Sequence, residues 1–146
     1  MKDPSRRVEG MVTMAQILVA QKKLDDAGNL LASAQREIDA RRAQAVPMLA
    51  FVRGDILARK GRIAEAQNAF LVETRMFPRN REAFVRLAAL QTLQGRVGDA
   101  EQTFERMAKG SPDPSSYSLA ADTFESLSQP SAAARWRARN AIKRAR

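Results

Sequence analysis

The amino-acid sequence predicts an all-α fold, an α-solenoid of about four helix–turn–helix units. The first observation is a repeat: residues 61–78 (GRIAEAQNAFLVETRMFP) and 95–112 (GRVGDAEQTFERMAKGSP) share Gly, Arg, Ala, Phe and Pro at an offset of 95 − 61 = 34. The second is that apolar residues recur at three- and four-residue steps and do not alternate, which favours helices over strands. The third is that Gly or Pro interrupts the helical stretches, as expected at helix ends.

Residues 47–80 and 81–114 are the two clearest units, and each predicts a pair of helices. In both units a Gly, Gly61 or Gly95, separates the first helix from the second. A Pro then stops the second helix. The four helices are expected between residues 48 and 60, 63 and 77, 84 and 94, and 97 and 111.

The second helix of each of these units carries a small residue four positions before a Phe. Ala66 precedes Phe70, and Ala100 precedes Phe104. Residues four apart lie on the same face of a helix. The small residue allows two helix axes to approach closely, and the Phe one turn later fills the space beyond.

The first unit, about residues 8–46, matches less closely. KKLDDAGNLLASA aligns with GRIAEAQNAFLVE, so that Ala27 and Leu31 take the places of the small residue and the Phe. The interval to the next unit is 66 − 27 = 39, and the five extra residues contain no Gly or Pro. The second helix of this unit is therefore expected to continue to about Gln44.

The last unit, about residues 115–146, begins after Asp113 as an N-cap and Pro114 at the first helical position. A first helix (SSYSLAADTFESL), a turn (SQPS) and a second helix (AAARWRARNAIKRAR) are expected to follow. In that second helix Ala134 takes the place of the small residue, 34 positions after its counterpart, and Ala138 replaces the Phe.

A helix–turn–helix period of 34 residues with A-x-x-x-F and a closing Pro resembles the tetratricopeptide repeat. Ala66, Phe70 and Pro78 carry the match, together with their counterparts 34 residues later. The resemblance implies one domain over residues 1–146, in which the units form a right-handed superhelix and the last unit acts as a cap. The alternative is an ordinary helical bundle whose spacing is coincidental.

Composition excludes several classes of site. The chain contains no Cys and no His, which removes disulfides, thiolate metal sites and the usual general base. We find no Gly-rich phosphate loop, no nucleophile–base pair and no metal-ligand spacing, so we expect no enzymatic activity, no cofactor and no metal. The longest apolar run, AVPMLAFV, is too short to span a bilayer, and the N-terminus lacks the apolar core of a signal peptide. A cytoplasmic location is favoured, and a periplasmic one requires that a signal peptide was removed.

In a tetratricopeptide array one stripe of each first helix lines a concave groove. The resemblance therefore places the partner-binding residues on these stripes. They are Val12, Gln16, Val19, Phe51, Asp55, Arg59, Val85, Arg86, Ala89, Thr92, Leu119 and Thr123. The apolar members favour an amphipathic helix or an extended peptide with apolar anchors as the ligand.

Three of these assignments have an alternative. Phe51 lies in a segment that is apolar all round, and it fits the core between units as well as it fits the groove. If Phe51 lines the groove, Phe51→Glu removes binding and leaves the fold intact, whereas a core Phe51 makes the same change unfold the protein. Asp55 and Arg59 are four residues apart and are expected to pair with each other on the surface.

Some tetratricopeptide proteins hold a C-terminal carboxylate with Lys, Asn and Arg side chains on their inner helices. The corresponding residues here are Val12, Gln16, Val52, Glu82 and Arg86. Only Arg86 fits, so this manner of binding is not expected.

The formal charge of +9 is concentrated in the last twelve residues, which carry six Arg or Lys and no acid. The preceding residues hold 25 − 6 = 19 basic and 16 acidic side chains, a net charge of only +3. The simpler interpretation is a capping helix with its charges toward water. The alternative is contact with a polyanion, in which a Trp stacks on a base. The residues concerned are Arg135, Trp136, Arg137, Arg139, Lys143, Arg144 and Arg146.

Three functions remain open from the sequence. The first, which is favoured, is a non-catalytic interaction module or scaffold that holds a peptide segment of another protein in the groove. The second is binding of nucleic acid or another anionic surface through the basic C-terminal helix. The third is a docking or regulatory region of a larger enzyme, because tetratricopeptide arrays are often joined to catalytic domains.

Overall fold

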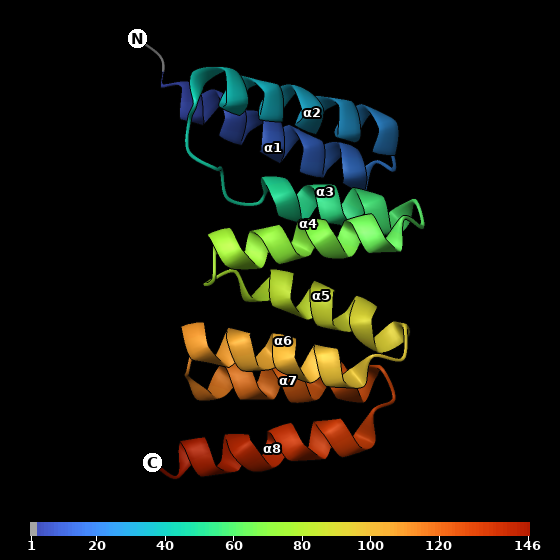
Figure 1. The fold of residues 1–146 in the computed structure, drawn as a ribbon, viewed down its shortest axis with the longest axis vertical. Coiled ribbons are helices and arrows are strands. Elements are labelled where there is room, and N and C mark those ends of the chain that lie inside the picture. The colour runs from blue at the N-terminus through green and yellow to red at the C-terminus, as the bar shows by residue number, and fades with distance from the viewer. Residues whose placement is uncertain (1–2) are drawn as a thin grey trace. The chain divides into compact units, whose positions relative to one another are not determined.

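The computed structural model describes residues 3–146, and within this range the regular secondary structure is eight α-helices in four hairpins (Figure 1). The helices are α1 (Pro4–Ala20), α2 (Leu24–Arg41), α3 (Leu49–Arg59), α4 (Ile63–Met76), α5 (Arg81–Leu93), α6 (Val97–Gly110), α7 (Pro114–Ser126) and α8 (Pro130–Arg144). The chain divides into two compact units, a first with α1–α4 that ends at Met76 and a second, Phe77–Arg146, with α5–α8.

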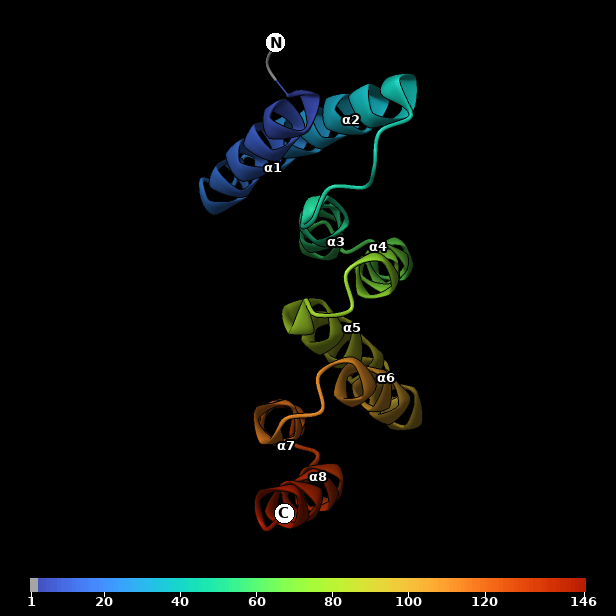
Figure 2. The same cartoon turned by 90° about the vertical axis from the view of Figure 1, so that its left-hand side faces the viewer.

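The two hairpins inside each unit pack in the same way. In the first unit α3 contacts both α1 and α2, and in the second unit α7 contacts both α5 and α6 (Figure 2). The first helix of the later hairpin thus rests on both helices of the earlier one. A helical repeat that cannot bury its apolar face alone buries it against its neighbour in this manner. A single domain over residues 1–146 and a right-handed superhelix stay predictions.

All four hairpins are closed by the same three-residue turn. The middle residue of the turn has a positive φ, which is 63° at Lys22, 77° at Gly61, 78° at Gly95 and 58° at Ser128. The N–H group of the next residue donates to the carbonyl five positions earlier at 2.8–2.9 Å. This is the Schellman pattern, which satisfies carbonyls at the end of a helix. The prediction that helices end at the two Gly residues is confirmed.

The helix α2 ends earlier than predicted, at Arg41 and not near Gln44. Arg42 adopts a left-handed conformation with a φ of 48°, and the N–H of Ala43 donates to the carbonyl of Ile38 at 2.9 Å. These are the features that end the other helices, but here neither Gly nor Pro marks the position in the sequence.

A carboxylate holds the loop that follows α2. Glu73 on α4 is only 1% exposed, and its Oε1 accepts a hydrogen bond from the backbone N–H of Met48 at 2.9 Å. Met48 is the residue before α3 and has a φ of 75°. The negative charge therefore lies at the N-terminus of α3, where the helix dipole favours it.

Two helices begin at the same short sequence, Asp-Pro-Ser. Asp113 accepts a hydrogen bond from the backbone N–H of Ser115 at 3.1 Å, so the predicted N-cap of α7 is confirmed. Asp3 caps α1 in the same way, at 3.0 Å from the N–H of Ser5. The hydrogen bonds from these serines lower the pKa of both carboxyl groups.

Side chains of complementary size face each other in the hairpins of the first unit. A Cβ atom at Gly54 of α3 would lie 2.9 Å from the ring of Phe70 on α4, which leaves no space for a methyl group. Ala15 and Leu31 occupy the corresponding positions of the α1–α2 hairpin, since 54 − 15 = 70 − 31 = 39, and both are buried. The larger residue on one helix and the smaller partner on the other are exchanged together.

Gly54→Ala is therefore expected to destabilise the protein although Ala is the better helix former. Overpacking against Phe70 costs about 1–3 kcal/mol, which exceeds the gain of about 1 kcal/mol in helix propensity. In a Phe70→Leu background the same substitution is expected to be neutral or stabilising, because it recreates the Ala15–Leu31 pair. Urea denaturation of the four proteins measures the coupling. An equal cost in both backgrounds would contradict this packing.

The register of α8 differs from the prediction. Its buried residues are Ala132, Ala133 and Trp136, whereas Ala134 and Ala138 are exposed. The predicted turn SQPS is shorter than expected because its Pro is the first residue of the helix. Pro suits that position, where its missing N–H group is not needed.

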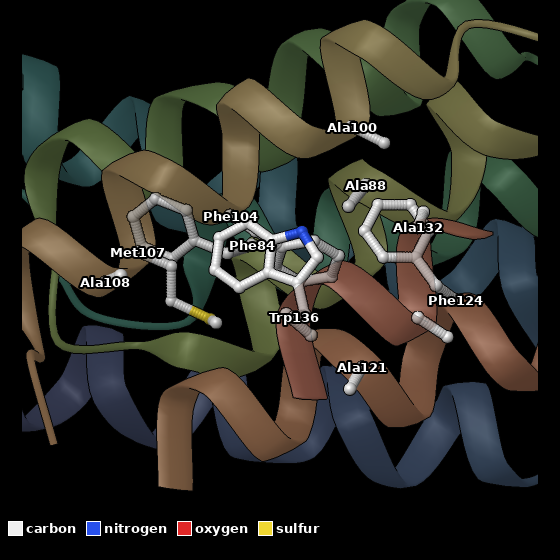
Figure 3. Close-up of a cluster of buried hydrophobic side chains, with 12 residues drawn as sticks. Phe84, Ala88, Ala100, Phe104, Met107, Ala108, Ala121, Phe124, Ala132 and Trp136 are labelled. Atoms are coloured by element: carbon white, nitrogen blue, oxygen red, sulfur yellow. The ribbon is translucent and has the colours of Figure 1, made fainter. Parts of the chain in front are cut away.

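Trp136 takes the place of the Phe in the last hairpin. Ala132 and Trp136 lie 32 residues after Ala100 and Phe104, since 132 − 100 = 136 − 104 = 32. The Trp136 ring is 1% exposed and packs edge-to-face on Phe104, with the ring centroids 5.9 Å apart (Figure 3). The Tyr117 ring lies 5.8 Å from it on the other side of the hairpin. The last repeat is thus two residues shorter than the 34-residue period.

Candidate functional site

A shallow hollow of about 190 Å³ lies between α1 and α3 of the first unit. It is lined by Gln16, Val19, Ala20, Phe51, Val52, Asp55 and Arg59. The structure thus brings together five of the six residues of this unit that the sequence assigned to a groove. The exception is Val12, which is 3% exposed, lies in the core and does not line the hollow.

The floor of the hollow is apolar and rigid. Val19, Phe51 and Val52 are 5%, 7% and 2% exposed, so only their edges reach the opening. The Phe51 ring packs edge-to-face against Phe70, with centroids 5.5 Å apart. Most of the Phe51 ring therefore belongs to the core, and the alternative that places it there is the correct one for its packing.

The rim of the hollow is polar. Gln16 is exposed, and Arg59 Nε lies 3.1 Å from Asp55 Oδ1 in the expected i, i+4 ion pair. Ala20, one helical turn after Gln16, is also exposed and completes the rim on α1. Sequence reasoning missed Ala20 and Val52, although Ala20 continues the i, i+4 spacing of the stripe and Val52 is adjacent to Phe51.

The remaining predicted groove residues lie on α5 and α7 of the second unit. Val85, Ala89 and Leu119 are partly exposed, and so is Arg86, whose Nε lies 3.5 Å from Glu82 Oε1. Two others are buried: Thr92 and Thr123 are 6% and 9% exposed. Their hydroxyl groups donate at 2.8 Å to backbone carbonyls four residues earlier, so this hydrogen-bonding capacity is used within their own helices.

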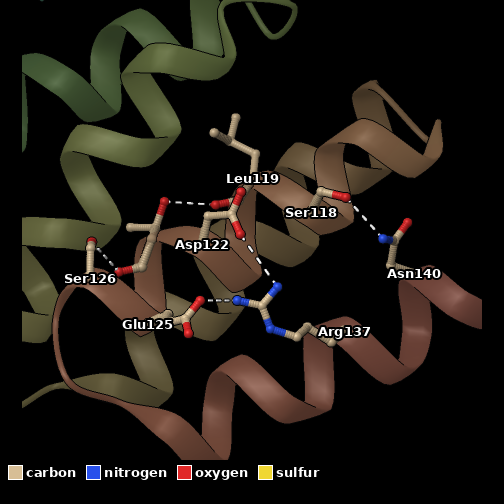
Figure 4. Close-up of polar contacts among 8 residues, drawn as sticks. Ser118, Leu119, Asp122, Glu125, Ser126, Arg137 and Asn140 are labelled. Carbon is tan, nitrogen blue, oxygen red and sulfur yellow. Dashed lines mark hydrogen bonds and ion pairs between the residues drawn. The ribbon is translucent and has the colours of Figure 1, made fainter.

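Folding pairs much of the basic charge of α8 with acids on neighbouring helices. Arg135 Nη2 lies 2.9 Å from Glu101 Oε1, and Arg139 pairs with Glu105. The guanidinium of Arg137 reaches both Asp122 and Glu125 of α7 (Figure 4). The hydrogen bond to Glu105 raises the pKa of Arg139 further, so this side chain stays charged.

The alternative in which Trp136 stacks on a base is wrong, because the folded protein encloses the ring. In addition, the guanidinium carbon of Arg139 lies 4.3 Å from the centroid of the indole. Both observations assign Trp136 to the core of the last hairpin.

The search for other sites gave no candidate within residues 3–146. This range holds no group of three acidic, His or Cys side chains close enough to bind one metal ion. Of the helices in the same range, none combines the length and the apolar character needed to cross a bilayer.

Comparison of the coordinates with solved structures places the fold among known ones. A crystal structure of MamA superimposes with a TM-score of 0.64 at 13% sequence identity, over 94% of this chain and 78% of that one. The fold is similar to that of MamA. Two further structures agree: MamA AMB-1 (P212121) gives a TM-score of 0.61 at 16% identity over 92% of this chain and 72% of that one, and MamA MSR-1 (C2) gives 0.57 at 18% over 90% and 78%.

MamA contains tetratricopeptide repeats, so the likeness supports a tetratricopeptide-like fold for this chain. The predicted fold class, an all-α helical-repeat solenoid, is confirmed. No protein-family model and no curated protein matches the sequence. At identities of 13–18% the comparison with MamA establishes the fold alone.

Proposed function

We propose that the chain is a non-catalytic module that binds a peptide segment of another protein, with the hollow between α1 and α3 as the anchoring point. The observation that carries this proposal is the combination of an apolar floor with a polar rim in one concave surface. A volume of about 190 Å³ is below the range of about 300–1,000 Å³ typical of small-molecule sites. It suits one apolar side chain of a peptide.

The mechanism is anchor burial on a preformed surface. The side chains of the floor are fixed by the core, so little ordering cost falls on the receptor. Burial of one Val, Leu or Phe side chain contributes about 1.5–3 kcal/mol, which alone falls short of even millimolar affinity. The bound segment must therefore also contact the exposed side chains beside the hollow, such as Gln16. Binding of this kind is expected to be weak and reversible.

The fold supports this function and adds no evidence of catalysis. The surfaces of helical repeats are common sites of peptide recognition. The same hollow could serve an independent scaffold or a docking region joined to an enzyme, since either would use the same anchoring contact. Clamping of a C-terminal carboxylate is not part of the proposal, because the residues at those positions are mostly apolar or acidic.

Selection of random peptides on the immobilised chain, followed by calorimetry with an enriched peptide, tests the proposal. Ala20→Tyr fills the rim of the hollow from an exposed position and is expected to weaken binding at least about tenfold, or about 1.4 kcal/mol. Ala64→Tyr is the matched control, because Ala64 is exposed on α4 of the same unit and does not line the hollow. If no peptide is enriched, or if both variants bind as the wild type does, the proposal fails.

A further inference from the structure

A second hollow, of about 270 Å³, lies between α7 and α8 in the second unit. It is lined by Tyr117, Arg139, Ile142, Lys143 and Arg146. Three of these five residues are basic and none is acidic. Ile142 is 59% exposed, so the hollow also presents an apolar side chain to solvent.

The positive charge that folding leaves unpaired lies at this hollow. Arg135, Arg137 and Arg139 each have a carboxylate partner on another helix. In contrast, no acidic side chain within residues 3–146 forms an ion pair with Lys143 or Arg144. Lys143 faces the hollow and Arg144 does not. A ligand that reaches the hollow therefore meets a cation available for a new ion pair.

The aromatic ring at this site is not free to stack. The guanidinium carbon of Arg139 lies 5.2 Å from the centroid of the Tyr117 ring, and Lys143 Nζ lies 6.0 Å from it. Trp136 covers the ring from within the core at 5.8 Å. A nucleobase binds to an aromatic residue through an open ring face, and Tyr117 has its faces occupied. The ring edge and Ile142 remain as apolar contacts.

We propose that this hollow binds an acidic segment of a partner protein that inserts one apolar side chain between Tyr117 and Ile142. The carboxylates of the segment pair with Lys143 and the neighbouring basic residues of α8. This site is separate from the hollow between α1 and α3, and it gives the chain a second, charge-selective contact. Because exposed ion pairs are screened by salt, binding is expected to weaken as the ionic strength rises.

The test uses the full chain and a fluorescein-labelled synthetic peptide of alternating Glu and Asp residues around a central Phe, measured by fluorescence anisotropy. Ile142→Ser is expected to weaken binding about tenfold through loss of apolar contact. Lys143→Gln is expected to weaken it about fivefold, as for one exposed ion pair. Arg144→Gln removes the same charge from the same helix outside the hollow, so it is expected to have a much smaller effect. A peptide with Ala in place of Phe is expected to bind about as weakly to wild type as the Phe peptide does to Ile142→Ser.

Several results would overturn the inference. Equal losses for Lys143→Gln and Arg144→Gln, with no preference for the Phe peptide, would mean that only overall charge matters. Tighter binding of an oligothymidylate, or of phosphatidylserine vesicles, that is insensitive to Ile142→Ser would assign the surface to a different polyanion. Absence of saturable peptide binding would also exclude it. Circular dichroism and melting verify that the variants are folded, and Ala20→Tyr is expected to leave this binding unchanged.

Discussion

Replacing Trp136 by Ala is expected to destabilise the protein by about 3–5 kcal/mol, the usual cost of truncating a fully buried aromatic residue. The ring fills the space between α8 and the preceding hairpin, and its removal leaves a cavity next to Phe104 and Tyr117. It also removes the cation–π contact with Arg139. A loss of this size is a large part of the total stability of a small domain, about 5–15 kcal/mol.

Urea denaturation followed by circular dichroism measures this loss. Ile142→Ala is the matched control, because Ile142 is an exposed apolar residue on the same helix and is expected to change stability by less than about 0.5 kcal/mol. Trp136→Phe should recover part of the loss, since it restores the residue type found at the equivalent position of α6. A cost below about 1 kcal/mol for Trp136→Ala would mean that the ring is not enclosed as described.

Phe51→Glu is expected to be the second most damaging substitution, with a loss of more than about 4 kcal/mol. It removes the edge-to-face contact with Phe70 and places a carboxylate in a site that is 7% exposed and apolar. A charge buried there would have no cation to pair with in the α1–α3 floor, and its desolvation is costly. The substitution therefore tests folding and cannot serve as a selective test of binding.

The comparison that isolates this effect is Phe51→Leu, which keeps an apolar side chain and is expected to retain a folded, helical protein. Thermal melting by circular dichroism separates the two variants. A normal melting curve for Phe51→Glu would show that the ring faces the groove and not the core. The description of the floor of the hollow would then need revision.

The parts of the fold that the sequence predicts are those with a local signal. Gly61 and Gly95 mark turns because Gly adopts a positive φ without steric cost, and both turns are present. Ala66 and Ala100, four residues before a Phe, mark close helix contacts, and both are fully buried. Asp113 marks a helix start because its side chain satisfies a free N–H group.

The parts that could not be predicted depend on contacts distant in sequence. Lys22 and Ser128 make the same turn as the glycines, but their side chains do not announce it. The burial of Glu73 depends on the backbone N–H of a loop 25 residues away. The register of α8 depends on a Trp that fills a Phe position after a repeat two residues shorter, and a fixed 34-residue offset cannot reveal this.

The candidate site was predicted in part for the same reason. The helical period places Gln16, Val19, Phe51, Asp55 and Arg59 on two stripes, and the structure places these stripes around one hollow. The period does not indicate how deep each side chain lies. Phe51 and Val19 are therefore mostly core, whereas Ala20 is an exposed part of the rim.

The most direct test of the proposed function is a titration of the ¹⁵N-labelled chain with an enriched peptide, followed by amide chemical shifts. If the hollow between α1 and α3 is the anchoring site, the largest changes will lie at Gln16, Ala20, Asp55 and Arg59. Changes that are absent there and concentrated on α2, on α4 or in the second unit would contradict it.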